Sequence, residues 1–106
     1  MGFFDFLFGK KDKPTADFKQ LAQDGALILD VRTKEEYDAG HIYGAINIPV
    51  QVIENHLDEI RNYNKKMVIA YCRSGRRSGN ATKILNKANI KTVNGGGFLA
   101  LKEILA

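Results

Sequence analysis

The sequence predicts an α/β fold in which a central, mainly parallel sheet of about five short strands is flanked by helices on both faces. Short apolar runs alternate along the chain with segments whose apolar residues recur at helical spacing. The chain has 106 residues, 44% hydrophobic and 26% charged, which is typical of one globular domain. We find no internal repeat. We expect an apolar N-terminal segment with a basic tail at residues 1–14, followed by one domain over residues 15–106.

The N-terminal segment is rich in phenylalanine. Four of the six phenylalanines lie within the first eight residues, and lysines follow. Asp5 interrupts the apolar run and no small-residue cleavage site follows, so the segment does not match a secretion signal, and no run in the chain is long enough to span a membrane. Residues 3–8 would place an apolar face on a short helix, which can lie on the domain, on a second copy or on a membrane surface. We favour packing on protein and a cytoplasmic location.

A helix and a buried strand are predicted to begin the domain. Phe18, Leu21 and Ala22 recur at helical spacing, and Gly25 can end that helix. The run ALILDV, residues 26–31, is apolar and β-compatible, which is typical of a strand covered on both faces.

The next elements are marked by cap residues. Thr33 and Glu36 form a capping box at the start of a helix that stops at Gly40. The run AINIP, residues 45–49, predicts a second strand ended by its proline. Residues 50–60 predict a helix with one apolar face, which consists of Val52, Ile53, Leu57 and Ile60.

The second half of the chain repeats this alternation. KMVIAY, residues 66–71, is the most strand-like run in the chain. IKTV, residues 90–93, predicts the last strand, and the glycines at 95–97 and a short apolar helix follow it. Between these strands lies a helical pattern with one apolar side, formed by Ala81, Ile84, Leu85 and Ala88.

The only cysteine, Cys72, directly follows the most strand-like run. In an open parallel sheet, ligand sites lie outside the carboxyl ends of the strands. A helix begins within a few residues, so we expect the turn over residues 73–77 to direct backbone N–H groups and the positive end of a helix dipole toward a common centre. Gly75 permits the backbone angles of such a turn. The alternative is that Cys72 is one more small buried apolar residue, as lone cysteines commonly are.

The three arginines of this turn favour a functional role. Arg73, Arg76 and Arg77 could not follow Cys72 into a core without partners. Cations at a helix N-terminus are also electrostatically misplaced unless an anion meets them. We therefore expect the Cys72 thiol to have a depressed pKa, to be open to solvent and to act as a nucleophile in an anion-binding cradle.

Two chemistries use a cysteine in such a loop. A protein-phosphatase loop would need an arginine six positions after the cysteine, where this chain has Ser78, and Arg77 arrives one residue early. The resulting ring is smaller. A smaller ring suits a single sulfur atom carried as a persulfide better than it suits a phosphate.

Three ordered motifs carry a family resemblance. LILDVRTKEEYDAGHIYGAINIP at 27–49, VIAYCRSGRRS at 68–78 and VNGGGFLAL at 93–101 together resemble the single-domain rhodaneses, which are thiosulfate sulfurtransferase-like proteins. The resemblance covers about residues 15–104. One departure is that the tryptophan usual after the Gly-Gly turn is absent, with Leu101 in that region, which leaves the shape of the pocket wall open.

The resemblance implies a role for each matching residue. Cys72 becomes the persulfide-forming nucleophile, and Asp30, Arg32 and Glu36 become ion-paired support near the site. His41 suggests a general base, but a turn-stabilising hydrogen bond is the simpler role, and His56 is expected to face solvent. The amides that hold the transferred sulfur would belong to the loop residues Arg73, Ser74, Gly75, Arg76 and Arg77.

The implied reaction moves sulfur from a small anionic donor such as thiosulfate to cyanide, a small thiol or a protein thiol. The acceptor must be external, because the chain has no second cysteine. No cofactor is implied, no metal site is expected from two distant histidines and one cysteine, and the scattered lysines do not favour nucleic acid. One alternative is a non-catalytic rhodanese-like module that carries sulfur or binds a partner. A phosphatase or an arsenate reductase is the less favoured alternative.

Overall fold

The structure is a computed structural model that describes residues 17–106. The expectations for segment 1–14, including the packing of residues 3–8, lie outside the described residues. Within 17–106, none of the helices has the length and apolarity needed to cross a membrane.

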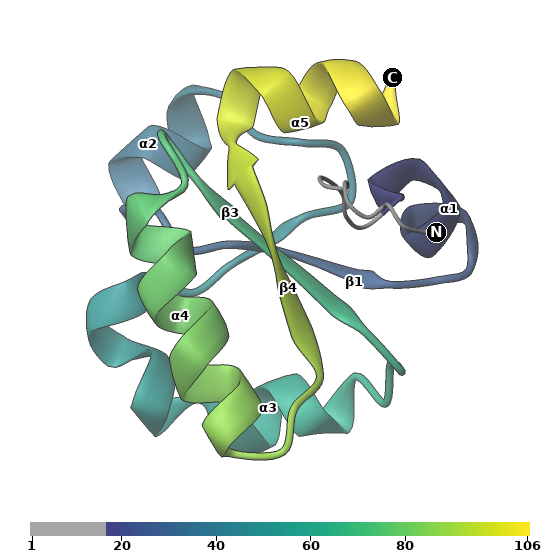
Figure 1. The fold of residues 1–106 in the computed structure, drawn as a ribbon. Coiled ribbons are helices and arrows are strands. Elements are labelled where there is room, and N and C mark those ends of the chain that lie inside the picture. The colour runs from purple at the N-terminus through teal and green to yellow at the C-terminus, as the bar shows by residue number, and fades with distance from the viewer. Residues whose placement is uncertain (1–16) are drawn as a thin grey trace, which may run out of the picture.

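The predicted α/β class is confirmed, with a wholly parallel sheet (Figure 1). The strand order is β2-β1-β3-β4, so β1 and β3 are the inner strands. Residues 17–106 form four strands and not about five, because each apolar run between helices supplies one strand. The strands are β1 (Leu27–Asp30), β2 (Ile46–Asn47), β3 (Val68–Cys72) and β4 (Thr92–Gly97).

Helices cover both faces of the sheet, as predicted (Figure 1). Alternate residues of each strand point to opposite faces, so Leu29 and Ala70 contribute to one apolar cluster and Ile28 and Ile69 to the other. The first cluster includes residues of η1, α3 and α4, and the second is packed by α1, α2 and α5. The elements are α1 (Phe18–Gln23), α2 (Lys34–Ala39), the 3₁₀ helix η1 (Val50–Asn55), α3 (Leu57–Asn62), α4 (Arg76–Lys87) and α5 (Phe98–Leu105).

The helix predicted to begin at Thr33 is present with its capping box. The Glu36 N–H donates to Thr33 Oγ1 at 3.2 Å, and the Thr33 N–H donates to Glu36 Oε1 at 3.0 Å. These two hydrogen bonds satisfy donors that the first turn of a helix leaves free. They also fix the Glu36 carboxylate at the start of α2.

The single helix predicted over residues 50–60 is wrong. The segment forms η1 and then α3, and the two are separated at His56. A 3₁₀ helix has three residues per turn, so Val50 and Ile53 share its inner face while Val52 is 38% exposed. Leu57 and Ile60 still pack on the core from α3, as expected.

The last strand is longer than predicted, because β4 continues through the glycines. Its register against β3 shifts between the pairs Ala70↔Asn94 and Tyr71↔Gly96, which leaves Gly95 as a bulge. Beyond the bulge, a Cβ atom on Gly97 would lie 2.7 Å from the Arg73 carbonyl oxygen. The glycines therefore let the loop that follows β3 lie directly on β4.

A buried polar network ties the carboxyl end of β1 to β3. Asp30 is fully buried and Arg32 is 5% exposed. The Arg32 Nη2 group donates to Asp30 Oδ2 at 2.7 Å and to the Gly40 carbonyl oxygen at 2.7 Å. Tyr71 Oη donates to Asp30 Oδ2 at 2.8 Å and accepts from the Ile42 N–H at 3.1 Å. The network fixes the chain on both sides of α2.

We predict that Asp30→Asn lowers the free energy of unfolding by about 3–5 kcal/mol, because it leaves the buried Arg32 charge without its partner. Chemical denaturation followed by circular dichroism measures this change. The matched control is Asp38→Asn, which removes an exposed i,i+4 pair with Lys34 and should leave the unfolding midpoint unchanged. Equal effects from both substitutions would contradict the conclusion that the buried Asp30–Arg32 pair stabilises the fold.

Gly95→Ala tests the bulge. The added Cβ atom would lie 2.7 Å from Ile69 Cγ2 and 3.0 Å from Leu101 Cδ2, so we expect a loss of about 1–3 kcal/mol in the free energy of unfolding. Gly79→Ala is the control. Gly79 lies within helix α4, and its added Cβ atom would meet only Asn94 Nδ2, at 3.4 Å. It should stabilise the protein by about 0.5–1 kcal/mol. A wild-type unfolding midpoint for Gly95→Ala would show that the bulge tolerates a side chain.

Candidate active site

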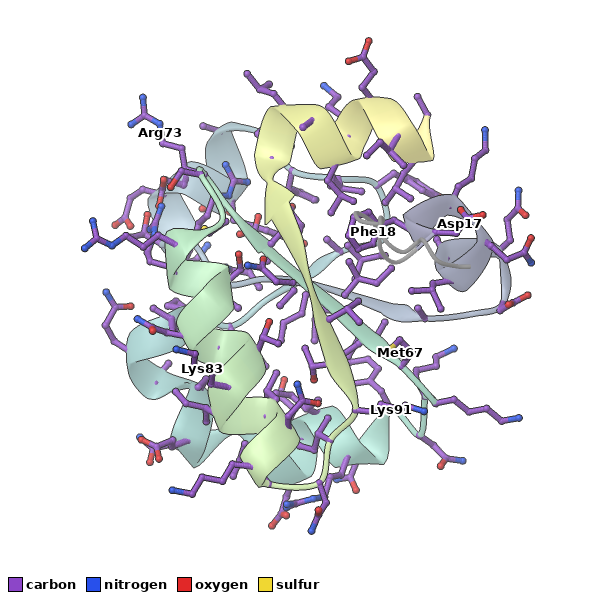
Figure 2. The ribbon with its side chains drawn as sticks, in the orientation of Figure 1. Asp17, Phe18, Met67, Arg73, Lys83 and Lys91 are labelled. Atoms are coloured by element: carbon purple, nitrogen blue, oxygen red, sulfur yellow. The ribbon has the colours of Figure 1, made fainter. Side chains whose placement is uncertain are left out.

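Cys72 is the last residue of β3, and α4 begins four residues later at Arg76. Gly75 is the N-cap of α4 with φ at 95°, a left-handed conformation that favours glycine. This turn reverses the chain over the end of the strand. Figure 2 shows the Arg73 side chain extending outward from the tip of this turn.

Three hydrogen-bonding groups surround the Cys72 sulfur. The Gly75 N–H donates to Sγ at 3.0 Å, and the Ser78 N–H lies 3.4 Å from it. Ser78 Oγ is also 3.4 Å from Sγ. The loop and the first turn of α4 therefore direct their N–H groups at one atom, which is an arrangement that stabilises negative charge on sulfur.

The expectation that the thiol is open to solvent is wrong. Cys72 has no exposed surface and belongs to the apolar cluster that includes Ala70 and Ala81. The reason is that the tight loop closes over the sulfur and packs on the glycines of β4. The sulfur is therefore buried like an ordinary core cysteine on one side and hydrogen-bonded on the other. In this conformation the sulfur is closed to solvent.

The pKa of the Cys72 thiol is lowered from its ordinary value. Burial acts to raise this pKa, but hydrogen bonds from the Ser78 hydroxyl and from the N–H groups of Ser78, Ser74 and Gly75 outweigh it. The direction agrees with the prediction. The loop hydrogen bonds are the larger lowering causes, and the nearby Arg77 cation also acts on the sulfur.

The three arginines of the loop have different surroundings. Arg73 and Arg76 are exposed. Arg77 is partly buried and donates to both carboxylate oxygens of Glu36, at 2.8 and 3.1 Å. The hydrogen bond with Arg77 lowers the pKa of Glu36 to about 2, although burial opposes this. The anion that meets Arg77 at the start of α4 is therefore a carboxylate of the protein.

A hollow of about 530 Å³ lies beside the loop. Leu99 at its edge is 75% exposed, whereas Leu101 is fully buried in the core and does not line the hollow. The missing tryptophan left the shape of one pocket wall open. In the structure, the residues just before Leu101 form this wall. A second hollow of about 680 Å³ includes neither the cysteine nor its loop. The first hollow is lined by Arg32, Glu36, Ala39, Arg73, Gly97, Phe98, Leu99 and Ala100.

Neither histidine contacts the thiol. His41 Nδ1 hydrogen-bonds the Tyr37 carbonyl oxygen at 2.8 Å, and the two rings stack with centroids 3.7 Å apart. His56 is 41% exposed and pairs with Glu59 at 2.8 Å. His41 therefore has a turn-stabilising hydrogen bond and His56 faces solvent. Over residues 17–106, no group of three or more His, Cys, Asp or Glu side chains is placed to hold a metal ion.

Two residues at the site were not predicted to act on the thiol. Ser78 contacts the sulfur, and its Oγ atom lies 2.7 Å from Asn94 Oδ1. Asn94 Nδ2 in turn donates to the Gly75 carbonyl oxygen at 3.0 Å. An asparagine before three glycines is typical of a turn, so no pattern indicated that Asn94 reaches the loop. The structure brings Cys72, its loop, Ser78, Asn94 and Glu36 together. Asp30 lies in the buried polar network, and Arg32 belongs both to that network and to the lining of the hollow.

Comparisons with known proteins identify the family. The model of the rhodanese-like domain matches residues 14–102. The chain is 36% identical over 76 residues to the thiosulfate sulfurtransferase PspE of Escherichia coli K12, which covers 72% of this chain and 71% of that protein. It is 39% identical over 66 residues to a candidate sulfur carrier protein, YrkF of Bacillus subtilis 168, which covers 62% of this chain and 35% of that protein.

Solved structures agree with these sequence matches. A rhodanese with anions from E. coli superposes with a TM-score of 0.65 and 33% identity, covering 71% of this chain and 89% of that one. The human single-domain sulfurtransferase TSTD1 superposes with a TM-score of 0.63 and 26% identity, covering 80% and 92%. The matched region includes the cysteine loop, the capped helix before it and the glycine strand beneath it, and the chain therefore belongs to the rhodanese-like domain family.

Proposed function

We propose that this protein is a sulfurtransferase that moves a sulfane sulfur from an anionic donor such as thiosulfate to a thiophilic acceptor through a persulfide on Cys72. The observation that carries the proposal is the set of hydrogen-bond donors that converge on Sγ from Gly75 and Ser78. The sulfurtransferases among the relatives support it.

The reaction has two displacement steps. In the first, the Cys72 thiolate attacks the outer sulfur of thiosulfate, a sulfur–sulfur bond forms, and sulfite leaves with the electron pair of the broken bond. In the second, cyanide or a thiolate attacks the outer persulfide sulfur, and the Cys72 thiolate leaves with its electron pair. The products are thiocyanate or an acceptor persulfide, and the enzyme is regenerated.

The loop residues divide this work between them. The N–H groups of Ser74, Gly75 and Ser78 stabilise the negative charge on sulfur before attack and after departure. Arg73 and Arg76 are exposed beside the loop and attract an anionic donor. A related rhodanese has been solved with anions, which supports an anionic substrate.

Entry of the donor requires displacement of the loop, because Cys72 has no exposed surface. The hollow bordered by Arg73 and Gly97 adjoins the loop and offers space for the rest of the donor or acceptor. Arg77 is anchored to Glu36, so we expect the movement to involve Arg73, Ser74 and Gly75, the part of the loop before that anchor.

The second candidate function is a sulfur carrier that forms the persulfide but passes it only to a protein partner. The similarity to the candidate carrier YrkF favours this possibility. The phosphatase and arsenate-reductase alternatives are weaker. The sixth position after the cysteine holds Ser78, which is neutral and buried against the sulfur and cannot bind the charge of a phosphate as an arginine would.

Treatment with thiosulfate should add one sulfur atom to the peptide that contains Cys72, as measured by mass spectrometry. Transfer from thiosulfate to cyanide should fall by at least about 10³-fold in Cys72→Ser, which lacks the nucleophile. Ser74→Ala is the control and should keep its transfer activity, because it removes an exposed side chain and leaves the backbone N–H in place. Sulfur transfer by Cys72→Ser would disprove the mechanism, and a persulfide that passes only to a protein thiol would assign the carrier function.

The rate of persulfide formation should rise with pH to a plateau, and the midpoint of this rise should lie below the ordinary pKa of a thiol. The reason is that only the thiolate attacks, and the lowered pKa of Cys72 places more thiolate at neutral pH. Stopped-flow kinetics over a pH series gives the midpoint, and the ultraviolet absorbance of the thiolate gives the same midpoint without substrate. A midpoint at or above that of a free thiol would contradict the assigned hydrogen bonds.

A further inference from the structure

Asn94 links three parts of the site through one side chain. It lies on β4 directly before the bulged Gly95. Its Oδ1 atom accepts from the Gly96 N–H at 2.9 Å and lies 2.7 Å from Ser78 Oγ. Its Nδ2 group donates to the Gly75 carbonyl oxygen at 3.0 Å. The side chain thus connects the glycine strand, the start of α4 and the loop around Cys72.

The orientation of this amide is fixed by backbone groups. An N–H can only donate, so the Gly96 N–H requires the oxygen of Asn94 on its side. A carbonyl oxygen can only accept, so Gly75 requires the nitrogen. The atom that faces Ser78 is therefore the oxygen, and Ser78 must be the donor of the 2.7 Å hydrogen bond.

The Ser78 hydroxyl has one proton and two neighbours that could accept it. Asn94 Oδ1 is 2.7 Å from Ser78 Oγ, whereas Cys72 Sγ is 3.4 Å away. Both distances suit a hydrogen bond, because sulfur is larger than oxygen, but an amide oxygen is a stronger acceptor than the sulfur of a neutral thiol. With the proton on Asn94, the hydroxyl presents a lone pair to the sulfur.

We propose that Asn94 is a positioning residue that holds the Ser78 hydroxyl proton away from the Cys72 sulfur while the thiol is neutral, and that yields this proton when the sulfur carries charge. No covalent bond changes in this step; the hydroxyl rotates and exchanges one acceptor for another. Asn94 therefore competes with the thiolate for a hydrogen bond. This role rests on the proposed function, because it matters only if Cys72 is the nucleophile.

The charged groups around Cys72 stay the same when Asn94 is replaced by a neutral residue. Arg77 on α4 faces the sulfur and is paired with Glu36 of α2. Asp30 on β1 is paired with Arg32. Strand β4 has the sequence TVNGGG and no ionisable side chain, and the loop adds only Arg73 and Arg76. A shift in the thiol pKa of a neutral variant therefore reports hydrogen bonds and not charge.

The test measures the Cys72 pKa in the full chain from the ultraviolet absorbance of the thiolate. Asn94→Ala frees the Ser78 proton for the thiolate, so the pKa should fall by about 0.5–1 pH unit, the equivalent of one hydrogen bond. Asn94→Asp keeps an acceptor for Ser78 and adds a negative charge, so the pKa should rise.

A double-mutant cycle with Ser78→Ala separates this effect from a looser loop. In the Ser78→Ala background no hydroxyl proton remains, so Asn94→Ala should no longer lower the pKa. Asn86→Ala is the matched control, because Asn86 of α4 also makes two side-chain hydrogen bonds to backbone groups. Both are to Thr92, at 2.9 Å, at the opposite end of β4 from the site. It should leave the thiol pKa unchanged even if it lowers the unfolding midpoint.

Opposite shifts in Asn94→Ala and Asn94→Asp, with the first abolished by Ser78→Ala, support the role of Asn94. Shifts in the same direction, or a fall that persists in the Ser78→Ala background, overturn it. The pKa measurement tests the role of Asn94 separately from the proposed function. If the wild-type protein gains no sulfur from thiosulfate, the function fails while the competition for the proton can still be observed; if it gains sulfur and the coupling is absent, only the role of Asn94 fails.

Discussion

The close contact between the loop after β3 and the glycine end of β4 is the constraint on which the site depends. The Arg73 carbonyl oxygen lies only 2.7 Å from the position that a Cβ atom of Gly97 would take, so these two backbones can meet this closely only at a glycine. This contact seals the loop over Cys72 and holds its N–H groups around the sulfur. The bulge at Gly95 supplies the change of register that turns the strand end toward the loop.

Sealing the sulfur has two opposing effects on its chemistry. Burial removes water and raises the energy of the thiolate, whereas the fixed donors of the loop and of α4 lower it. The donors prevail, and because they are fixed in place they need no reorganisation when charge forms. In the proposed mechanism, opening the loop for substrate also loosens the donors. A loop that opens only at one end, before Arg77 and its Glu36 anchor, would retain the donors that belong to α4.

Local signals in the sequence predicted the elements whose stability is local. The Thr33 capping box and the apolar side of α4 specify helices without reference to the rest of the chain. Residues 50–60 misled because their apolar residues fit both a period of 3.6 and a period of three, and only packing on the core selects between them. The burial of Cys72 and the hydrogen bonds of Asn94 depend on contacts between segments about twenty residues apart, which no local pattern encodes.

The arginines show how tertiary contacts redistribute charge that looks uniform in the sequence. Three cations in five residues suggested a common role in binding an anion. Arg77 is instead neutralised by Glu36, whose position is set by the capping box of α2, so a helix cap determines the charge that the loop presents to solvent. The exposed cations are Arg73 and Arg76, of which Arg73 lies in the part of the loop expected to move and Arg76 begins α4. In the proposed mechanism, the Arg73 charge is therefore carried by the part of the loop that is displaced to admit a donor, whereas Arg77 stays in place and is already paired with Glu36.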